Sequence, residues 1–231
     1  MGLRRLNPIY NPTLTLLNNL RKYRLSFHHS KLLSQLFTCF LILFCTVEVA
    51  SARKVSRVIV DAGHGGRDSG AARGSTHEKD LALKVALRVE KLLKSKGMPV
   101  TMTRRSDKFI SLNGRAEIAN RYENAIFVSI HFNASRSNRL TGVETYYYGG
   151  DGQKLAAHVH LRMLSALSPR DGKTRKRQDL AVLNKTKCPA ILVECGYISN
   201  YSERLKCRTS SYQEKCAKAI VDGIFAYKNF K

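Results

Sequence analysis

The chain has 231 residues, of which 43% are hydrophobic, and its 40 basic and 17 acidic side chains give a formal charge of +23. This length allows one domain with a substantial core and excludes two large ones. The charge indicates a polyanionic partner, which can be a nucleic acid, an anionic lipid or an acidic polymer, with general basicity as the alternative. No nucleic-acid partner is expected, because zinc-finger, helix-turn-helix and aromatic–glycine RNA-binding motifs do not occur.

The N-terminal segment has the pattern of a secretory signal. Residues 1–31 hold six basic residues and no acidic one, and residues 36–47 are mostly apolar. Ala50-Ser51-Ala52 follows as a small-x-small cleavage pattern. The apolar run is shorter than the ~20 residues of a membrane-spanning helix. We therefore predict that residues 1–52 are a signal peptide, or are retained as a membrane-targeting segment, and that the protein is exported to the periplasm or cell envelope.

Beyond the signal, strand and helix patterns alternate, which is typical of a single α/β domain over residues 53–231. The predicted strands cover 58–61, 99–103, 125–130, 143–148, 180–183 and 190–193, and the predicted helices cover 78–96, 111–123, 153–167 and 212–227. Ser111 is a suitable N-cap for the second helix. Residues 171–177 are interpreted as a basic loop.

Three of the predicted strands end in side chains that can carry chemistry. His64 follows the first strand inside a glycine loop, His131 ends the third, and Glu194 ends the last. Glu78 begins the first helix. Because the carboxyl ends of strands form the binding crevice of open α/β sheets, these residues are expected to gather there. Two imidazoles and two carboxylates in one crevice would make a catalytic zinc site, with Glu194 as the general base.

Each candidate also has a structural interpretation. A strand-end histidine can bond a backbone carbonyl, and a glutamate at a helix N-terminus is favoured by the helix dipole. His77 rivals Glu78 as a ligand, since composition cannot separate neighbours. Glu194 can instead pair with a basic residue. Asp61 can accept a hydrogen bond from the glycine loop or orient a ligand imidazole. Arg115 and the basic loop can bind substrate carboxylates or phosphates, or the loop can be solvated.

Five elements in chain order carry a family resemblance. They cover residues 59–71, residues 78–81, residues 102–104 together with 112–120, residues 127–134 and residues 189–200. Together they resemble the zinc-dependent N-acetylmuramoyl-L-alanine amidases of the amidase-3 type. The resemblance extends over about residues 57–228, so that residues 53–231 would be an amidase catalytic domain.

The resemblance implies one zinc ion per chain, bound by His64, Glu78 and His131, and thus favours Glu78 over His77. It implies Glu194 as the catalytic glutamate. We also predict Asn133 and Arg115 as substrate-binding residues, with Asp61 behind the ligands. The implied fold is a twisted mixed sheet of about six strands flanked by helices. The implied substrate is peptidoglycan or a muropeptide, cut between N-acetylmuramic acid and L-alanine during cell-wall remodelling or cell separation. A monomer is expected.

Three other interpretations compete. Ser51-x-x-Lys54, residues 111–113 and residues 185–187 occur in the order of penicillin-binding-protein motifs, although the third lacks its glycine. A zinc carboxypeptidase would share the fold class, and a wall-binding protein would share the fold without the activity.

In an exported protein, disulfides can also form among four cysteines, in a pairing that the sequence does not reveal. These are Cys188, Cys195, Cys207 and Cys216.

Overall fold

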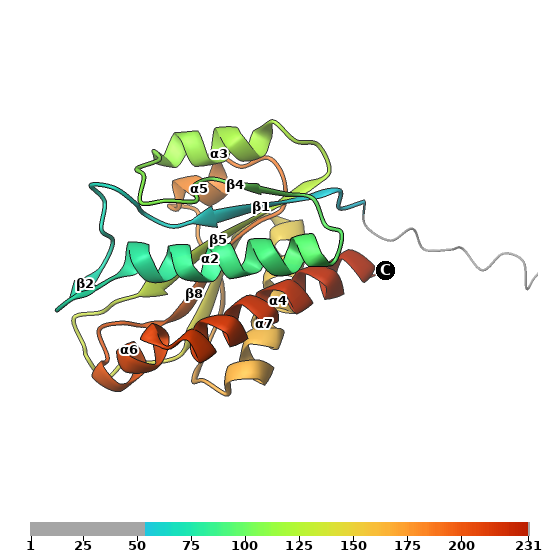
Figure 1. Ribbon diagram of the computed structural model, residues 1–231. Helices are drawn as coiled ribbons and strands as arrows, with labels where there is room; N and C mark the ends of the chain where they lie inside the picture. Colours follow the sequence, from blue (N-terminus) through green and yellow to red (C-terminus); the bar gives the residue numbers. More distant parts are fainter. Residues whose placement is uncertain (1–53, 231) are drawn as a thin grey trace, which may run out of the picture. The chain divides into compact units, whose positions relative to one another are not determined.

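The computed structural model describes residues 54–230, and the predicted signal segment lies outside them (Figure 1). A six-stranded sheet with the order β4-β1-β5-β8-β6-β7 forms its centre. The strands are β1 (Arg57–Ala62), β4 (Val100–Met102), β5 (Ala125–Asn133), β6 (Val143–Tyr148), β7 (Asp171–Lys176) and β8 (Ala190–Tyr197). The first four strands in this order run parallel, β6 is antiparallel to β8, and β7 is parallel to β6. The mixed sheet of about six strands is therefore confirmed.

Helices cover both faces of the sheet, as Figure 1 shows. One face packs against α2 (Glu78–Ser95), α4 (Gly150–Leu167) and α7 (Ser210–Asn229), and the other against α3 (Leu112–Asn120) and α5 (Ala181–Asn184). Alternation along the strands makes this possible, because successive side chains point to opposite faces. Val60 and Val128 join the larger core, whereas Ile59 and Phe127 join the smaller one, and all four are fully buried. The sandwich positions the carboxyl ends of β1, β5 and β8 side by side.

Two short strands and one helix were not predicted. β2 (Ala72–Arg73) and β3 (Thr76–His77) pair as a small hairpin before α2. α6 (Tyr201–Arg208) follows β8, and its N-cap Asn200 accepts a hydrogen bond from the backbone N–H of Glu203. An asparagine three residues before a glutamate is close to the capping-box pattern, so the sequence did carry a signal for this helix.

Two predicted segments are wrong. Residues 171–177 are not a basic loop, because residues 171–176 form β7 at the edge of the sheet. Basic side chains are common on edge strands, where they discourage pairing with another chain. Residues 180–183 are not a strand, because residues 181–184 form the single turn of α5. A four-residue apolar run fits a buried helical turn as well as a strand.

Among the described residues, no helix is both long enough and apolar enough to cross a membrane. The four cysteines of this region are free thiols, and Cys195, Cys207 and Cys216 are fully buried in the larger core.

Candidate metal centre

Three predicted ligands converge at the carboxyl end of β1 and β5. His64 follows β1, His131 lies near the end of β5, and Glu78 is the first residue of α2. Glu78 Oε1 lies 3.0 Å from His64 Nε2 and 2.8 Å from His131 Nδ1. One donor atom from each side chain lies within 4.8 Å of the other two. The structure thus brings two imidazoles and one carboxylate to a single point.

Glycines make this close approach sterically possible. A Cβ at Gly63 would lie 2.4 Å from the His131 ring, and a Cβ at Gly70 would lie 2.6 Å from both Glu78 Oε2 and the His64 ring. His64 itself has a φ of 59°, which non-glycine residues rarely adopt. Strained backbone of this kind persists where the surroundings hold it and is concentrated at functional sites.

Backbone amides fix the carboxylate of Glu78. The N–H of Ala71 donates to Oε2 at 2.9 Å, and the N–H of Phe132 donates to Oε1 at 3.1 Å. Burial opposes ionisation of Glu78, but hydrogen bonds from His131 and His64 hold its pKa well below the usual value. Burial likewise opposes the charged form of His64, but Glu78 and Asp68 raise the pKa of its imidazole. The carboxylate of Glu78 is therefore kept ionised, which is the form that binds a cation.

The donor set fits zinc. Two imidazole nitrogens and one carboxylate oxygen form one of the ligand sets used by catalytic zinc, with a further position open to water or substrate. His77 is not part of this cluster. Its Nδ1 lies 3.6 Å from Asp80 Oδ2 on the surface. Geometry therefore favours Glu78 over His77 as the third ligand.

Besides Glu78, the carboxylate of Asp68 contacts a candidate ligand imidazole, and the sequence predicted no role for it. Asp68 Oδ2 lies 2.9 Å from His64 Nδ1, and Asp68 Oδ1 accepts from the N–H of Gly70. A carboxylate behind a ligand histidine fixes its tautomer and its ring orientation. The sequence signal for it is the position four residues after His64, in the same glycine loop.

Replacing Asp68 by alanine should weaken zinc binding by roughly 10–100-fold, because His64 loses the partner that orients its ring. Competition with a calibrated zinc chelator would measure this affinity. Asp151→Ala, on the exposed first turn of α4, is a matched control and should leave the affinity unchanged. An unchanged affinity in Asp68→Ala would contradict this role.

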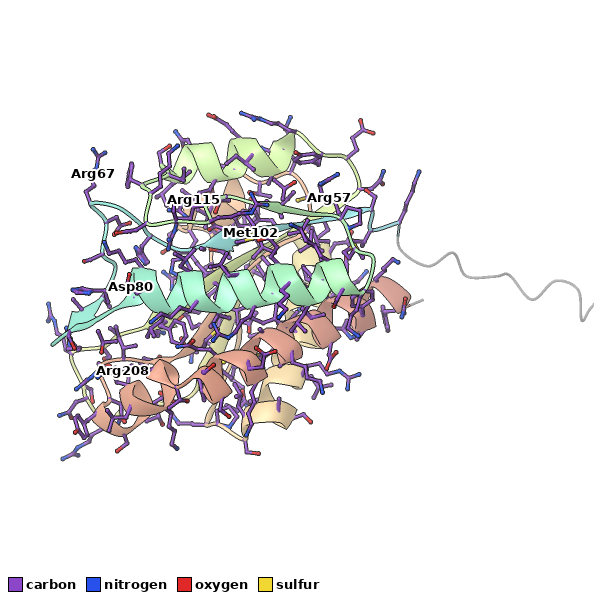
Figure 2. All side chains as sticks on the ribbon, in the orientation of Figure 1. Arg57, Arg67, Asp80, Met102, Arg115 and Arg208 are labelled. Atoms are coloured by element: carbon purple, nitrogen blue, oxygen red, sulfur yellow. The ribbon has the colours of Figure 1, made fainter. Side chains whose placement is uncertain are left out.

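Asp61 lies one layer deeper and contacts no imidazole directly. Its fully buried carboxylate accepts hydrogen bonds of 2.6 Å from each of Thr103, Ser129 and Arg115. Figure 2 shows Arg115 between α3 and β1. Arg115 is 2% exposed, and its guanidinium also donates to the backbone carbonyls of Ala62, His64 and Ile110. These contacts support the His64 loop; whether Arg115 also binds substrate stays a prediction.

A second buried arginine, Arg104, supports the same loop. It donates to the carbonyls of Ala62 and Gly63 and to that of Lys79 in α2. It thereby ties the His64 loop to the helix that begins with Glu78. Sequence reasoning assigned it no role, because backbone carbonyls across separate segments leave no pattern in a single sequence.

Glu194 lies on β8, beside the three candidate ligands His64, Glu78 and His131. Its Cα is the register partner of His131 on β5 and of Glu144 on β6. Among the described residues, its Oε2 is the only buried side-chain oxygen or nitrogen without a hydrogen-bond partner. Burial, followed by the carboxylates of Glu78 and Glu144, raises its pKa well above the usual value. A buried carboxylate with a raised pKa and an oxygen that no hydrogen bond engages has the properties of a general base.

Asn133 lies at the end of β5, close to Glu144. Its Nδ2 donates to Glu144 Oε2 at 3.1 Å, and Tyr146 donates its hydroxyl proton to the same oxygen. Its Oδ1 accepts from the N–H of Ala134. Both ends of the Asn133 amide are thus engaged, and its predicted contact with substrate stays a prediction.

The penicillin-binding motifs do not assemble within the described residues. Ser51 lies outside them. Lys185 Nζ donates to Asn113 Oδ1 at 2.7 Å, while Ser111 caps α3 by accepting from the N–H of Gly114. The last two motifs therefore touch, but their hydroxyl and amide groups serve a helix cap and a surface contact.

Comparison with known proteins gives a consistent result. The family described as N-acetylmuramoyl-L-alanine amidase matches residues 58–226. The germination-specific N-acetylmuramoyl-L-alanine amidase of Bacillus subtilis is 32% identical over 186 residues, which cover 74% of this chain and 78% of that protein.

Solved structures agree with the sequence match. The catalytic domain of CwlV, an N-acetylmuramoyl-L-alanine amidase from Bacillus (Paenibacillus) polymyxa, superposes with a TM-score of 0.73 at 36% identity, covering 76% of this chain and 99% of that one. The CwlD amidase from Clostridioides difficile, solved in complex with the GerS lipoprotein, superposes with a TM-score of 0.72 at 32% identity. The match covers 74% of this chain and 98% of that one.

Proposed function

Because the chain belongs to the N-acetylmuramoyl-L-alanine amidase family and hydrolyses the amide bond that defines it, we propose that it works with one zinc ion held by His64, Glu78 and His131. The observation that carries the proposal is their convergence. Three separate segments place two nitrogens and one oxygen within 4.8 Å of one another. Asp68 behind His64 supports it further.

The positions of the side chains indicate which part of the reaction the metal serves and which part Glu194 serves. When bound, zinc supplies a Lewis acid that polarises the amide carbonyl and acidifies water. Oε2 of Glu194 takes the proton of the attacking water as the new C–O bond forms. The same oxygen then gives this proton to the nitrogen as the C–N bond breaks, which releases a carboxylic acid and an amine.

The substrate and the location belong to the same proposal. One relative, from Staphylococcus epidermidis, is named a probable cell wall amidase, and the Bacillus subtilis relative is named for the muramoyl-L-alanine amide, which supports peptidoglycan in the cell envelope as the substrate of this chain. We propose muramoyl-L-alanine as the cleaved linkage and a periplasmic location, reached through the predicted signal. Removal of residues 1–52 would leave a formal charge of +18. Such a surface would hold the enzyme near anionic wall polymers or lipid head groups.

Digestion of defined muropeptides tests this function. The zinc-loaded protein should release intact stem peptides beginning with L-alanine, as identified by mass. A chelator should remove the activity, because the ligands that remain cannot polarise the carbonyl, and added zinc should restore it. Loss of a C-terminal D-residue instead would indicate a carboxypeptidase. Full activity after verified zinc removal would overturn the metal assignment.

A further inference from the structure

A basic surface with exposed apolar side chains lies at the same end of the sheet as the metal centre. Two segments form it, α6 and the loop of residues 134–142 after β5, and together they are the α6 patch. The strands that lead into them, β5 and β8, carry His131 and Glu194 in their carboxyl-terminal halves. Figure 1 shows α6 at the end of the sheet where β2 lies, and Figure 2 labels Arg208 there.

Two large side chains of α6 are open to solvent. Tyr201 is 66% exposed and Leu205 is 44% exposed. They are four residues apart, so they lie next to each other on one side of the helix. The guanidinium carbon of Arg204 lies 5.3 Å from the centre of the Tyr201 ring, so a cation borders this apolar strip. Single exposed apolar residues are ordinary, but adjacent ones with a polar border are a feature of binding surfaces.

The charges that the α6 patch presents to solvent are all positive. Residues 134–142 and 198–211 contain five basic side chains and one acidic side chain. The acidic one, Glu203, is buried, and its carboxylate accepts hydrogen bonds from backbone N–H groups. Four of the basic side chains are exposed, and none of the four has an ion-pair partner among the residues that the structure describes. They are Arg136, Arg139, Lys206 and Arg208.

Hydrogen bonds hold the two segments of the patch together. The side-chain amide of Asn200 donates to the carbonyl of Asn138 at 2.8 Å, and the N–H of Ser135 donates to Ser199 Oγ at 3.1 Å. The Glu203 carboxylate adds a third link, because it accepts from the N–H of Gly142 in the loop. The cations and the apolar strip are therefore held on one ordered backbone, and a partner does not have to order this surface before it binds.

The combination of apolar and basic groups indicates the partner. An acidic polymer in solution would pair with the cations but would leave Tyr201 and Leu205 in water. A protein partner is disfavoured, because lysine is depleted in the buried cores of protein interfaces. An anionic bilayer uses both features. Aromatic and leucine side chains enter the boundary between headgroups and acyl chains, while cations stay with the lipid phosphates.

We propose that the α6 patch docks the protein on a membrane surface rich in anionic lipids. Tyr201 and Leu205 enter the headgroup region, and the four exposed cations contact lipid phosphates. Because the patch follows β5 and β8, docking places the catalytic edge of the sheet near the bilayer. The substrate within reach is then the peptidoglycan closest to the membrane. This inference rests on the envelope location in the proposed function and names the surface that maintains it.

Tryptophan fluorescence tests the docking, because the chain contains no tryptophan. Tyr201→Trp introduces a reporter into the patch, and Leu161→Trp is the control on α4, where Leu161 is 62% exposed. Each reporter senses its own surroundings, so the result does not depend on residues 1–52. The probes are vesicles of phosphatidylglycerol with phosphatidylcholine, and vesicles of phosphatidylcholine alone.

Only one combination of reporter and vesicle should respond. With the anionic vesicles, the emission of Tyr201→Trp should move to shorter wavelength and be quenched by brominated lipids, because the side chain leaves water. With phosphatidylcholine alone it should stay unchanged, and Leu161→Trp should not respond to either vesicle. Equal responses of the two reporters, or no response of Tyr201→Trp, would overturn the proposal.

Charge substitutions in the Tyr201→Trp protein separate the patch from general basicity. Arg139→Ser/Lys206→Ser/Arg208→Ser should weaken binding to the anionic vesicles about a hundredfold, since each cation near an anionic membrane contributes about fivefold.

A charge-matched control removes three cations elsewhere. Arg162→Ser/Lys215→Ser/Lys218→Ser changes exposed positions on α4 and α7 and should weaken vesicle binding less than about threefold, because salt screens distant charges. Equal losses in the two triple variants would assign the binding to net charge and overturn the patch.

Leu205→Ser tests the apolar contact and distinguishes a bilayer from a soluble polymer. It should weaken binding to the anionic vesicles about tenfold, because a leucine side chain no longer leaves water. Soluble poly(glycerol phosphate) is the competing probe. If it binds more tightly than the vesicles and Leu205→Ser does not affect its binding, the partner is an acidic polymer and the proposal is wrong.

Hydrolysis of a soluble muropeptide separates this inference from the proposed function. All of these variants should cleave it at the wild-type rate, because none of the changed residues belongs to the metal centre. A protein that docks through the patch but cleaves no muropeptide would overturn the proposed function and keep the docking surface. A protein that cleaves muropeptides while its Tyr201→Trp reporter ignores anionic vesicles would overturn the docking surface alone.

Discussion

Replacement of Glu194 by alanine should reduce kcat for muropeptide cleavage by about 10²–10⁴-fold while zinc content stays at the wild-type level. This is the range expected when a positioned general acid–base is lost. The Glu194 carboxylate lies beside the three candidate ligands, and its Oε2 has no hydrogen-bond partner among the described residues. It is not among the three donors that converge. Removing it should therefore remove proton transfer without removing a ligand.

Two measurements made together decide this. Zinc content is determined by atomic absorption on the purified variant, and kcat by product release from a defined muropeptide. Glu117→Ala, which removes an exposed carboxylate from α3, should match the wild type in both. Cleavage by Glu194→Ala at a near-normal rate would exclude the general-base role. Loss of zinc would instead make Glu194 a ligand.

The candidate site was more predictable from the sequence than the residues that support it. His131 and Glu194 were predictable because each follows an apolar run in a predicted strand, and His64 because it follows the first strand in a glycine loop; the carboxyl ends of such strands meet in one crevice. Glu78 was harder, because a glutamate at a helix N-terminus is ordinary, and only the family resemblance separated it from His77. The structure adds the reason, since Ala71 and Phe132 donate their N–H groups to its carboxylate.

The supporting residues left weaker signals. Arg104 bonds backbone carbonyls of Ala62, Gly63 and Lys79, and a carbonyl is present at every residue, so no sequence pattern marks the contact. The edge of the sheet was misread for a related reason. Residues 171–176 become β7 only because β6 offers them a partner, so tertiary pairing overrides their polar composition.

Replacement of Arg115 by alanine should lower the free energy of unfolding by about 3–5 kcal/mol, the usual cost of breaking a buried ion pair from one side. Asp61 is fully buried, and Arg115 is the only charged group among its three hydrogen-bond partners. The variant would break their 2.6 Å ion pair. The carbonyls of Ala62, His64 and Ile110 would each lose a donor as well. Urea-induced unfolding followed by circular dichroism measures the change. Arg121→Ala, on the surface after α3, should change it by less than about 0.5 kcal/mol.

The same variant separates two roles for Arg115. If it supports the loop of His64, stability and zinc affinity should both fall, because the carbonyl of His64 is held at 2.7 Å by this guanidinium. If it binds substrate instead, KM should rise with stability unchanged.

The double variant Asp61→Asn/Arg115→Met removes both buried charges and should recover part of the lost stability, since most of the loss comes from leaving the Asp61 carboxylate unpaired. A double variant no more stable than Arg115→Ala would locate the loss in the carbonyl contacts and not in the ion pair.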